Sequence, residues 1–347
     1  MNRRDALKLL RSGLVVSAAS SIHPLFAAAR KKRDNRPVAL LLPLSGERAA
    51  LGLSMQRAAA LAESGGGTLL PLDTAGTATG ASAAAQAALK RGAAMILGPL
   101  TSWEASAAAG VVAGRVPVLA FTNNMAAAAS GAFVFGLTPA QTTTAVLRYA
   151  RSRGVRSVTV VGDGSAWSNG AAESAVKAQG AIGLDVRVVT VTAGAPLPAV
   201  GEAPDAVLVP GSGEAVLAAA RSLKETGVQL LGTVQALDYR PSALEALDGA
   251  WIAAPDPKAF GGFASDYEGR NGGDPGTLAA LAYDAARIVE VLRAANTLSR
   301  DGLLAADSFP CVTGAVRFRT DGSCARDLAI LVASRDGYGS VAVSRGA

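Results

Sequence analysis

Short apolar runs alternate with longer segments of helical character over the first third of the chain after residue 36. Strands are predicted at residues 38–42, 69–72, 94–97 and 116–121, and helices at residues 48–63, 80–91 and 102–113. Apolar runs of this length without alternation are typical of strands that are buried on both faces. A strand–helix–strand order at this spacing predicts a parallel sheet covered by helices on both sides.

The same pattern begins again after Pro139. Helices are predicted at residues 141–151, 169–179 and 214–225, strands at 157–161, 186–191, 206–209 and 229–232, and a loop at 193–204. A long helix is predicted at residues 275–295, and strand-like segments follow at 316–319 and 328–333. The predicted fold class is α/β, with two similar lobes that each contain a parallel sheet flanked by helices, and a chain that crosses between the lobes more than once.

Composition and charge exclude two broad classes of protein. Half of the 347 residues are apolar and 17% are charged, which excludes intrinsic disorder. The formal charge is +6, of which residues 1–29 contribute +3 and residues 30–36 contribute +4, so residues 37–347 carry −1. Because the basic charge belongs to the N-terminal segment, we expect no nucleic-acid partner.

The N-terminal segment is predicted to be an export signal. Residues 1–29 contain Arg3 and Arg4, an apolar stretch and a small-residue end, which predicts cleavage near Ala29 and a periplasmic protein. The start is twin-arginine-like, and residues 30–36 form a basic linker. An amphipathic helix or a membrane anchor is the alternative, but the apolar stretch is short for a membrane span. We therefore expect no integral membrane protein after signal removal.

Several catalytic classes are excluded by one residue count. The only histidine is His23, inside the predicted signal, so the mature chain has no residue for a Ser-His-Asp triad, a Cys-His pair or a histidine-ligated metal. The phosphate-binding and dinucleotide-binding glycine motifs are absent as well. We predict a protein that is not an enzyme and has no cofactor or metal site, with catalysis by a pair of carboxylates as the remaining enzymatic alternative.

The two cysteines, Cys311 and Cys324, flank a predicted hairpin. In an exported protein such a pair is expected to form a disulfide, and two buried thiols are the alternative.

Polar segments, three of which contain glycine, follow five of the predicted strands. They are residues 98–102, 122–124, 163–167, 210–213 and 233–235. Open parallel sheets bind ligands at the carboxyl ends of their strands, so these segments are candidates for one binding cleft. Helix capping is the alternative for single residues such as Ser102 and Ser212.

Several motifs resemble those of a known family. They are residues 41–46 (LLPLSG), 98–102 (GPLTS), 117–121 (PVLAF), 281–285 (LAYDA) and 313–318 (TGAVRF). In this order the motifs resemble the leucine-binding branch of type 1 periplasmic solute-binding proteins. Residues 120–123 (AFTN) and 253–257 (AAPDP) are similar to the bacterial penicillin-binding protein activator group. Members of that group are commonly lipoproteins, whereas no cysteine lies near the predicted cleavage site here.

The resemblance implies two lobes that are joined by three crossovers and close on a ligand. The implied boundaries place lobe 1 at residues 37–138 plus 258–308 and lobe 2 at residues 139–257 plus 309–347. The ligand-binding residues that the resemblance implies are Thr101, Ser102, Thr122, Asn124, Trp167, Ser212 and Gln235. The acidic residue that usually meets an α-ammonium group is missing, because residues 232–235 (GTVQ) contain no carboxylate and Asp238 is the first one after them.

The function expected from the resemblance is non-enzymatic capture of a small solute, an amino acid or a related compound, for the permease of an ABC transporter. The alternative is a regulator of peptidoglycan synthesis that uses the same fold to contact a cell-wall synthase.

Overall fold

The computed structural model describes residues 34–63, 69–191 and 203–347. The predicted export signal lies outside these ranges, as do most of the basic linker and most of the loop predicted at 193–204. Contacts group Arg33–Ala347 into one unit, and everything below concerns this unit.

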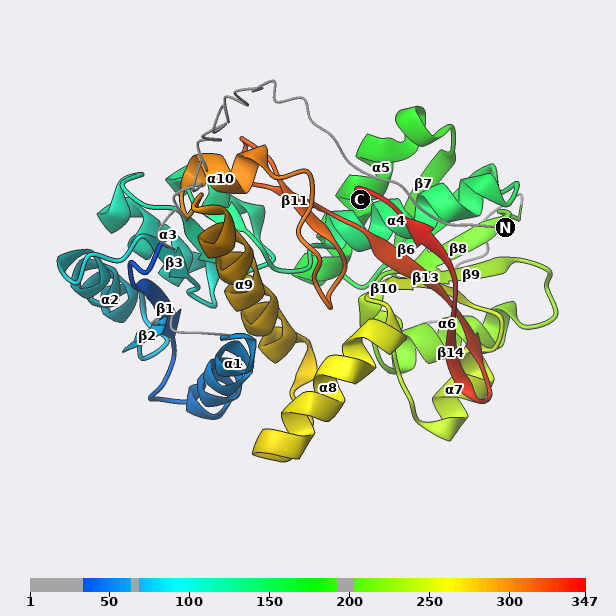
Figure 1. Cartoon of the computed structure of the whole chain (residues 1–347). Coiled ribbons are helices and arrows are strands. Elements are labelled where there is room, and N and C mark those ends of the chain that lie inside the picture. Colours follow the sequence, from blue (N-terminus) through cyan, green and yellow to red (C-terminus); the bar gives the residue numbers. More distant parts are fainter. Residues whose placement is uncertain (1–33, 64–68, 192–202) are drawn as a thin grey trace, which may run out of the picture. The chain divides into compact units, whose positions relative to one another are not determined.

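The first sheet, of which β1, β2 and β3 are labelled in Figure 1, is entirely parallel. Its strand order is β2-β1-β3-β4-β5. The strands are β1 (Val38–Leu42), β2 (Leu69–Asp73), β3 (Met95–Leu97), β4 (Val118–Ala120) and β5 (Phe133–Val134), and the helices between them are α1 (Ala49–Ala62), α2 (Ala78–Lys90) and α3 (Ser102–Val112), followed by the 3-10 helix η1 (Met125–Ser130).

Strand β1 shows why an unbroken apolar run forms the centre of this sheet. All five of its residues are buried. Val38 and Leu40 pack into the cluster that contains α1 and α9 residues, whereas Ala39 and Leu41 pack into the cluster with α2 and α3. Because side chains alternate along a strand, burial on both faces requires apolar residues at every position.

The second sheet has the order β14-β13-β10-β9-β8-β6-β7. Its strands are β6 (Ser157–Gly162), β7 (Asp185–Thr190), β8 (Ala206–Val209), β9 (Gln229–Gly232), β10 (Trp251–Ala254), β13 (Leu328–Ser334) and β14 (Gly337–Ser344). Its helical segments are α4 (Pro139–Ser152), α5 (Ala166–Ile182), α6 (Glu214–Leu223), η2 (Val234–Ala236) and α7 (Pro241–Leu247). The strands from β6 to β10 pair in parallel, whereas β13 and β14 add an antiparallel hairpin at one edge.

The chain passes between the two sheets three times. After β5 it enters α4, which packs on the second sheet. After β10 it returns to α8 (Pro257–Asn271) and α9 (Gly276–Ala295), and α9 packs against α1 and β3 of the first sheet. The third passage follows α10 (Arg300–Ala305) and leads through the small hairpin β11 (Val316–Phe318) and β12 (Cys324–Arg326) to β13.

The predicted fold class is confirmed: two helix-flanked lobes with parallel-sheet cores, the second carrying the antiparallel hairpin described above. The lobe boundaries inferred from the resemblance stay a prediction. The small hairpin, which that prediction assigned to lobe 2, packs against the core of the first sheet, because Val316, Phe318 and Cys324 belong to the same buried cluster as β1.

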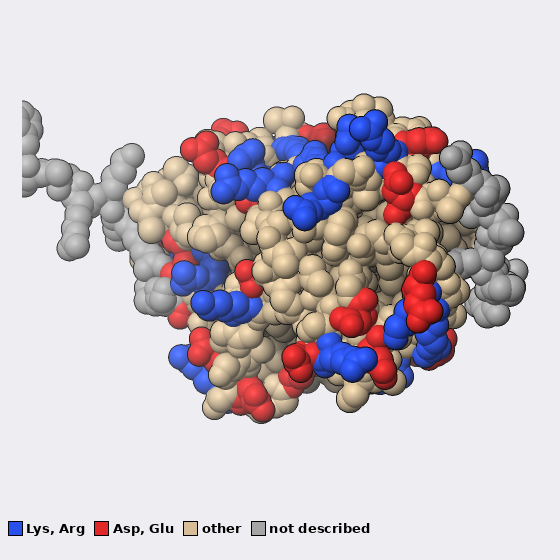
Figure 2. All heavy atoms as spheres, turned by 90° about the vertical axis from the view of Figure 1, so that its right-hand side faces the viewer, with Lys and Arg blue, Asp and Glu red and all other residues tan. Residues whose placement is uncertain are grey.

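Surface charges of both signs are present on the face that Figure 2 shows, with Asp and Glu among the Lys and Arg side chains. Among the described residues, no helix is long and apolar enough to span a membrane.

Candidate functional site

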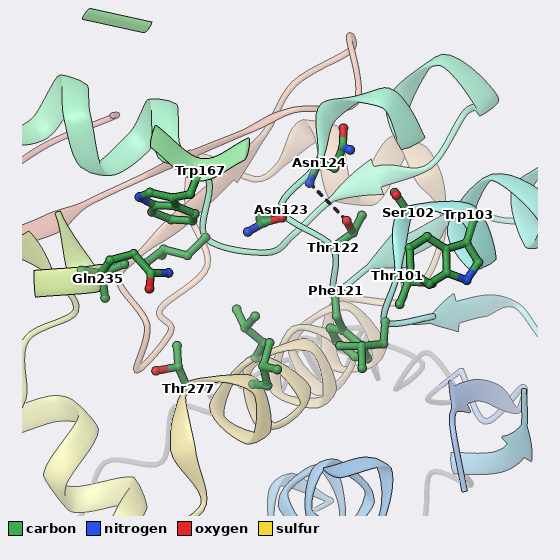
Figure 3. Close-up of a pocket in the computed structure, with 15 residues that line it drawn as sticks. Thr101, Ser102, Trp103, Phe121, Thr122, Asn123, Asn124, Trp167, Gln235 and Thr277 are labelled. Carbon is green, nitrogen blue, oxygen red and sulfur yellow. Dashed lines mark hydrogen bonds between the residues drawn. The ribbon is translucent and has the colours of Figure 1, made fainter. Parts of the chain in front are cut away.

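A cavity of about 580 Å³ lies at the carboxyl ends of strands from both sheets (Figure 3). Loops after β3, β4, β6 and β9 contribute to its wall, together with the first turns of α9. Its lining residues are Leu100, Thr101, Ser102, Trp103, Phe121, Thr122, Asn123, Asn124, Leu137, Trp167, Val234, Gln235, Thr277, Leu278 and Leu281. This position is the one at which open parallel sheets bind ligands.

The loop after β3 is held by a capping box. The Thr101 hydroxyl donates to Oε2 of Glu104 at 2.6 Å and accepts a bond from the Glu104 amide at 3.4 Å. The fully buried Glu104 carboxylate also accepts bonds from the Thr101 amide and from the Thr74 hydroxyl. Thr101 therefore fixes the start of α3, and the adjacent Ser102 lines the cavity.

The loop after β4 is organised by two residues that the resemblance implied. The Asn124 amide donates to Oγ1 of Thr122 at 3.1 Å, and Oδ1 of Asn124 accepts a bond from the Ala126 amide at 2.9 Å (Figure 3). These bonds leave the Thr122 hydroxyl proton and the Asn124 side-chain NH₂ available. Asn123, between them, points toward Trp167 across the cavity.

Trp167 lines the cavity from the second sheet. Its indole Nε1 donates to Oγ1 of Thr233 at 3.2 Å, and the Thr233 hydroxyl donates to the Pro210 carbonyl at 2.7 Å. The bond to Thr233 fixes the orientation of the indole and uses its only donor. What Trp167 offers to a ligand is its ring surface.

Gln235 lies beside Trp167, in η2 (Figure 3). Asp238, the first carboxylate after it in sequence, does not line the cavity. It forms an ion pair with Arg240 at 2.5 Å, and the hydrogen bond from Arg240 lowers the pKa of Asp238. Residues 232–235 contain no carboxylate, and Asp238 does not provide one to the cavity in their place.

Six of the seven expected residues meet at this cavity, and the seventh does not. Ser212 is exposed and is not a lining residue. It lies in the loop between β8 and α6, where Gly213 takes a φ of 66° at the helix start. The sequence placed this loop at the correct end of its strand but could not give the direction in which the loop turns.

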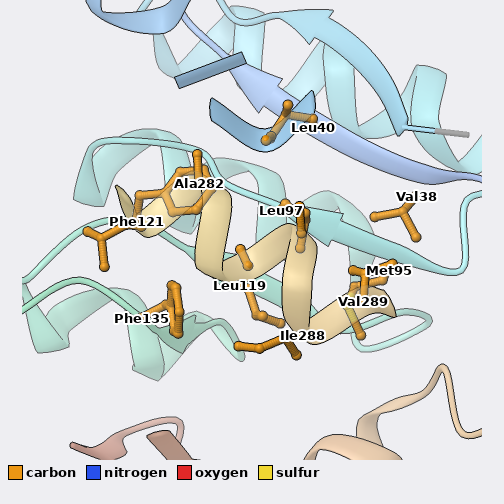
Figure 4. Close-up of a cluster of buried hydrophobic side chains, with 14 of the residues drawn as sticks. Val38, Leu40, Met95, Leu97, Leu119, Phe121, Phe135, Ala282, Ile288 and Val289 are labelled. Atoms are coloured by element: carbon orange, nitrogen blue, oxygen red, sulfur yellow. The ribbon is translucent and has the colours of Figure 1, made fainter. Parts of the chain in front are cut away.

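Sequence analysis missed the part of the wall that α9 provides. Thr277, Leu278 and Leu281 line the cavity, whereas later residues of the same helix, Ile288 and Val289, pack into the core of the first sheet (Figure 4). The apolar stripe of α9 gave no signal that its first turns lie at a ligand cavity.

Both cysteines are free thiols in the structure, not the expected disulfide. Cys324 lies opposite Phe318 in the hairpin, whereas Cys311 lies in a turn beyond the bridge between Phe309 and Val316. The hairpin register therefore places the two cysteines at opposite ends of β11. The Cys324 thiol instead donates to the Val134 carbonyl at 3.3 Å, and burial raises the pKa of both thiols.

Within the described ranges, no cluster of three or more His, Cys, Asp or Glu residues could hold a metal ion.

Comparisons with known proteins agree with this geometry. The periplasmic binding protein family matches residues 37–337. No curated protein sequence matches the chain. A Rhodospirillum rubrum protein assigned as a branched-chain amino acid ABC transporter is 24% identical, with a TM-score of 0.78, over 88% of this chain and 99% of its own.

Two further solved structures are similar to the chain. The C-domain of LpoA from Haemophilus influenzae, a regulator of PBP1A, has a TM-score of 0.72 and 16% identity over 88% of this chain and 100% of its own. A solute-binding protein from R. palustris, solved with benzoate, has a TM-score of 0.60 and 18% identity over 90% of this chain and 96% of its own. The family match covers most of the chain, and the two-lobed fold and the position of the cavity agree with it. The chain belongs to the periplasmic binding protein family.

Proposed function

We propose that this protein captures a small solute in the cavity between its two sheets and presents it to the permease of an ABC transporter, without catalysing a reaction. The observation that carries the proposal is the cavity of about 580 Å³, whose hydroxyl, amide and aromatic groups come from loops of both sheets. This volume falls within the range of about 300–1,000 Å³ that is typical of small-molecule sites. The family and the transporter-associated neighbours support it.

The location follows from the same proposal. A solute receptor for a transporter acts outside the cytoplasmic membrane, which agrees with the export signal expected at residues 1–29 and cleavage near Ala29. The mass and the N-terminal sequence of protein recovered from the periplasm test this. An uncleaved N-terminus would contradict it.

Thermal unfolding of the mature protein tests the binding function. The panel contains amino acids, short peptides, small aromatic compounds and cell-wall fragments. A ligand at a hundred times its dissociation constant adds about 2.7 kcal/mol to the free energy of unfolding, which raises Tm by several degrees. A rise with any small solute supports the proposal, and no rise with any compound contradicts it.

A second candidate function rests on the likeness to the LpoA C-domain. Under this alternative the protein contacts a peptidoglycan synthase and regulates it. Direct binding of the mature protein to a purified synthase, measured by biolayer interferometry, tests the alternative. Binding to the synthase together with no response to any small solute would favour regulation over transport.

A further inference from the structure

Among the described residues that line the cavity, none has a charged side chain. Seven of the fifteen lining residues carry a hydroxyl or an amide, and the other eight are aliphatic or aromatic. Their polar groups include donors and acceptors, because an amide side chain provides both. The lining therefore offers hydrogen-bond donors that can hold a carboxylate, but no negative charge to compensate the ammonium group of a free amino acid.

Three carboxylates that lie within four residues of a lining residue already accept hydrogen bonds in the structure. Glu104 is fully buried and accepts three hydrogen bonds, from Thr101 and Thr74. Asp238 is paired with Arg240, and Oδ1 of Asp163 accepts a bond from the Ser165 amide at 2.9 Å. An ammonium group in the cavity would therefore meet no carboxylate of the lining.

The aromatic groups do not replace a carboxylate. The guanidinium of Arg48 lies 5.9 Å from the ring centre of Trp103, so this ring already faces a cation. Trp167 offers one further ring. A cation–π contact contributes about 0.5–2 kcal/mol, whereas burying an unpaired ion costs several kcal/mol. The balance is against a ligand that places an ammonium group in the cavity.

The remaining lining groups provide an apolar surface and a set of hydrogen-bonding side chains for a ligand. Ring surface is available at Trp167, whose N–H is used by Thr233, and apolar surface at Phe121, Leu278 and Leu281. The side chains of Asn123 and Gln235 form no hydrogen bond with another described residue and lie near Trp167 (Figure 3). Flat apolar rings stack on such a surface, and amide or hydroxyl groups bond to such side chains.

We infer that the cavity selects a ligand that combines a flat ring with amide or hydroxyl groups and carries no ammonium group, and that it therefore discriminates against free amino acids. This inference rests on the proposed binding function and specifies its substrate class.

Four phenylalanine derivatives that differ in charge test the inference. Phenylalanine is zwitterionic, and N-acetylphenylalanine is anionic. Phenylalanine amide is cationic, and N-acetylphenylalanine amide is neutral. Titration calorimetry is performed at about pH 6, below the α-amino pKa of about 7.7–8.0. We expect the two compounds without an ammonium group, the neutral and the anionic one, each to bind at least about ten-fold more tightly than the zwitterionic and the cationic one, a difference of about 1.4 kcal/mol.

A charge-gain variant gives an independent readout. Gln235→Glu places a carboxylate in the lining, so we expect the affinity ratio of the cationic to the neutral compound to rise by about ten-fold or more. The matched control is Gln86→Glu, an exposed position on α2 that does not line the cavity, and there the ratio stays unchanged.

The possible outcomes distinguish a failure of this inference from a failure of the proposed binding function. Tightest binding of the zwitterion or the cation by the wild-type protein overturns the inference and leaves the solute-binding function in place. If none of the four binds while a panel compound without a flat ring raises Tm, the ring requirement is overturned. If no small solute raises Tm, the binding function itself fails. An equal rise of the ratio in both glutamate variants would also overturn the role of Gln235.

Discussion

Two polar regions of this molecule use their side chains in opposite ways. The first is a buried network formed by Asp284, Thr313, Arg326 and the Phe135 carbonyl, which joins α9 to two of the passages between the sheets. The second is the cavity. The network contains two full charges that both bond to the Thr313 hydroxyl and to backbone groups, whereas the cavity contains neutral groups, several without a partner in the described chain.

The contrast shows what each region is built for. Asp284 is fully buried and accepts bonds from the amides of Val312 and Thr313 and from the Thr313 hydroxyl. Burial raises the pKa of Asp284, although these bonds and the charge of Arg326 act in the opposite direction. Charges that are internally compensated hold segments together, and neutral groups left open are available to a ligand.

The largest expected effect comes from breaking the network. Arg326→Met removes the bonds from Arg326 to Thr313 and to the Phe135 carbonyl and leaves Asp284 buried without a cation. We expect a loss of about 3–5 kcal/mol in the free energy of unfolding, measured by urea denaturation. The control Arg319→Met changes an exposed arginine of the same hairpin and is expected to cost less than about 0.5 kcal/mol. Equal losses would show that the network is not a special source of stability.

A change in the cavity is expected to do the reverse, with a large effect on binding and a small one on stability. Trp167→Ala removes the ring surface and is expected to weaken binding of the preferred ligand by about ten- to a hundred-fold. Trp167→Phe keeps a ring without the N–H and is expected to restore most of the affinity, measured by calorimetry. If Trp167→Phe is as weak as Trp167→Ala, the bond to Thr233 is the essential feature, not the ring.

The comparison between Ser102 and Ser212 tests whether the cavity is the site. Ser102 lines it and Ser212 does not, although both lie at the start of a helix after a parallel strand. We expect Ser102→Ala to weaken binding by about three- to ten-fold, since one neutral hydrogen bond contributes about 0.5–1.5 kcal/mol. Ser212→Ala is expected to leave the dissociation constant unchanged. A loss confined to Ser212→Ala would place the ligand elsewhere.

An element could be predicted from the sequence where neighbouring residues alone determine it, and not where contacts with distant residues do. The strands 38–42 and 157–161 were predictable because burial on both faces requires consecutive apolar residues. Strand β5, with two residues, and β10, with the sequence WIAA, gave no such signal, because their pairing is decided by neighbours distant in sequence. The buried network was not predicted either, since nothing local to Asp284 or Arg326 marks them as partners.

Part of the cavity was also predictable from the sequence. Loops at the carboxyl ends of parallel strands meet at one edge of a sheet, which brought Thr122 and Trp167 to the site. The direction in which each loop turns is a tertiary property, so Ser212 was included and Thr277 was missed.

The smallest expected effect concerns Asp73, a carboxylate at the end of β2 that serves structure and not the ligand. It accepts bonds from the amides of Leu44, Ser45 and Ala75 and from the Ser45 hydroxyl. Although burial acts against them, these bonds together lower the pKa of Asp73 below its usual 3.8. Because the folded state holds the carboxylate in its charged form, its stabilising contribution is complete above the unfolded pKa and is lost as pH falls through the lower folded pKa.

Asp73→Asn is therefore expected to cost up to about 1 kcal/mol at neutral pH, since the site is exposed and its bonds are partly replaced by water. The difference between wild type and variant should stay constant down to about pH 5 and shrink below about pH 4, as measured by urea denaturation across pH. The control Asp266→Asn changes an exposed carboxylate on α8. A difference that grows as pH falls would contradict the role of the charged form. A loss of ligand affinity in Asp73→Asn would contradict the division between the two regions, because a carboxylate would then contribute to binding.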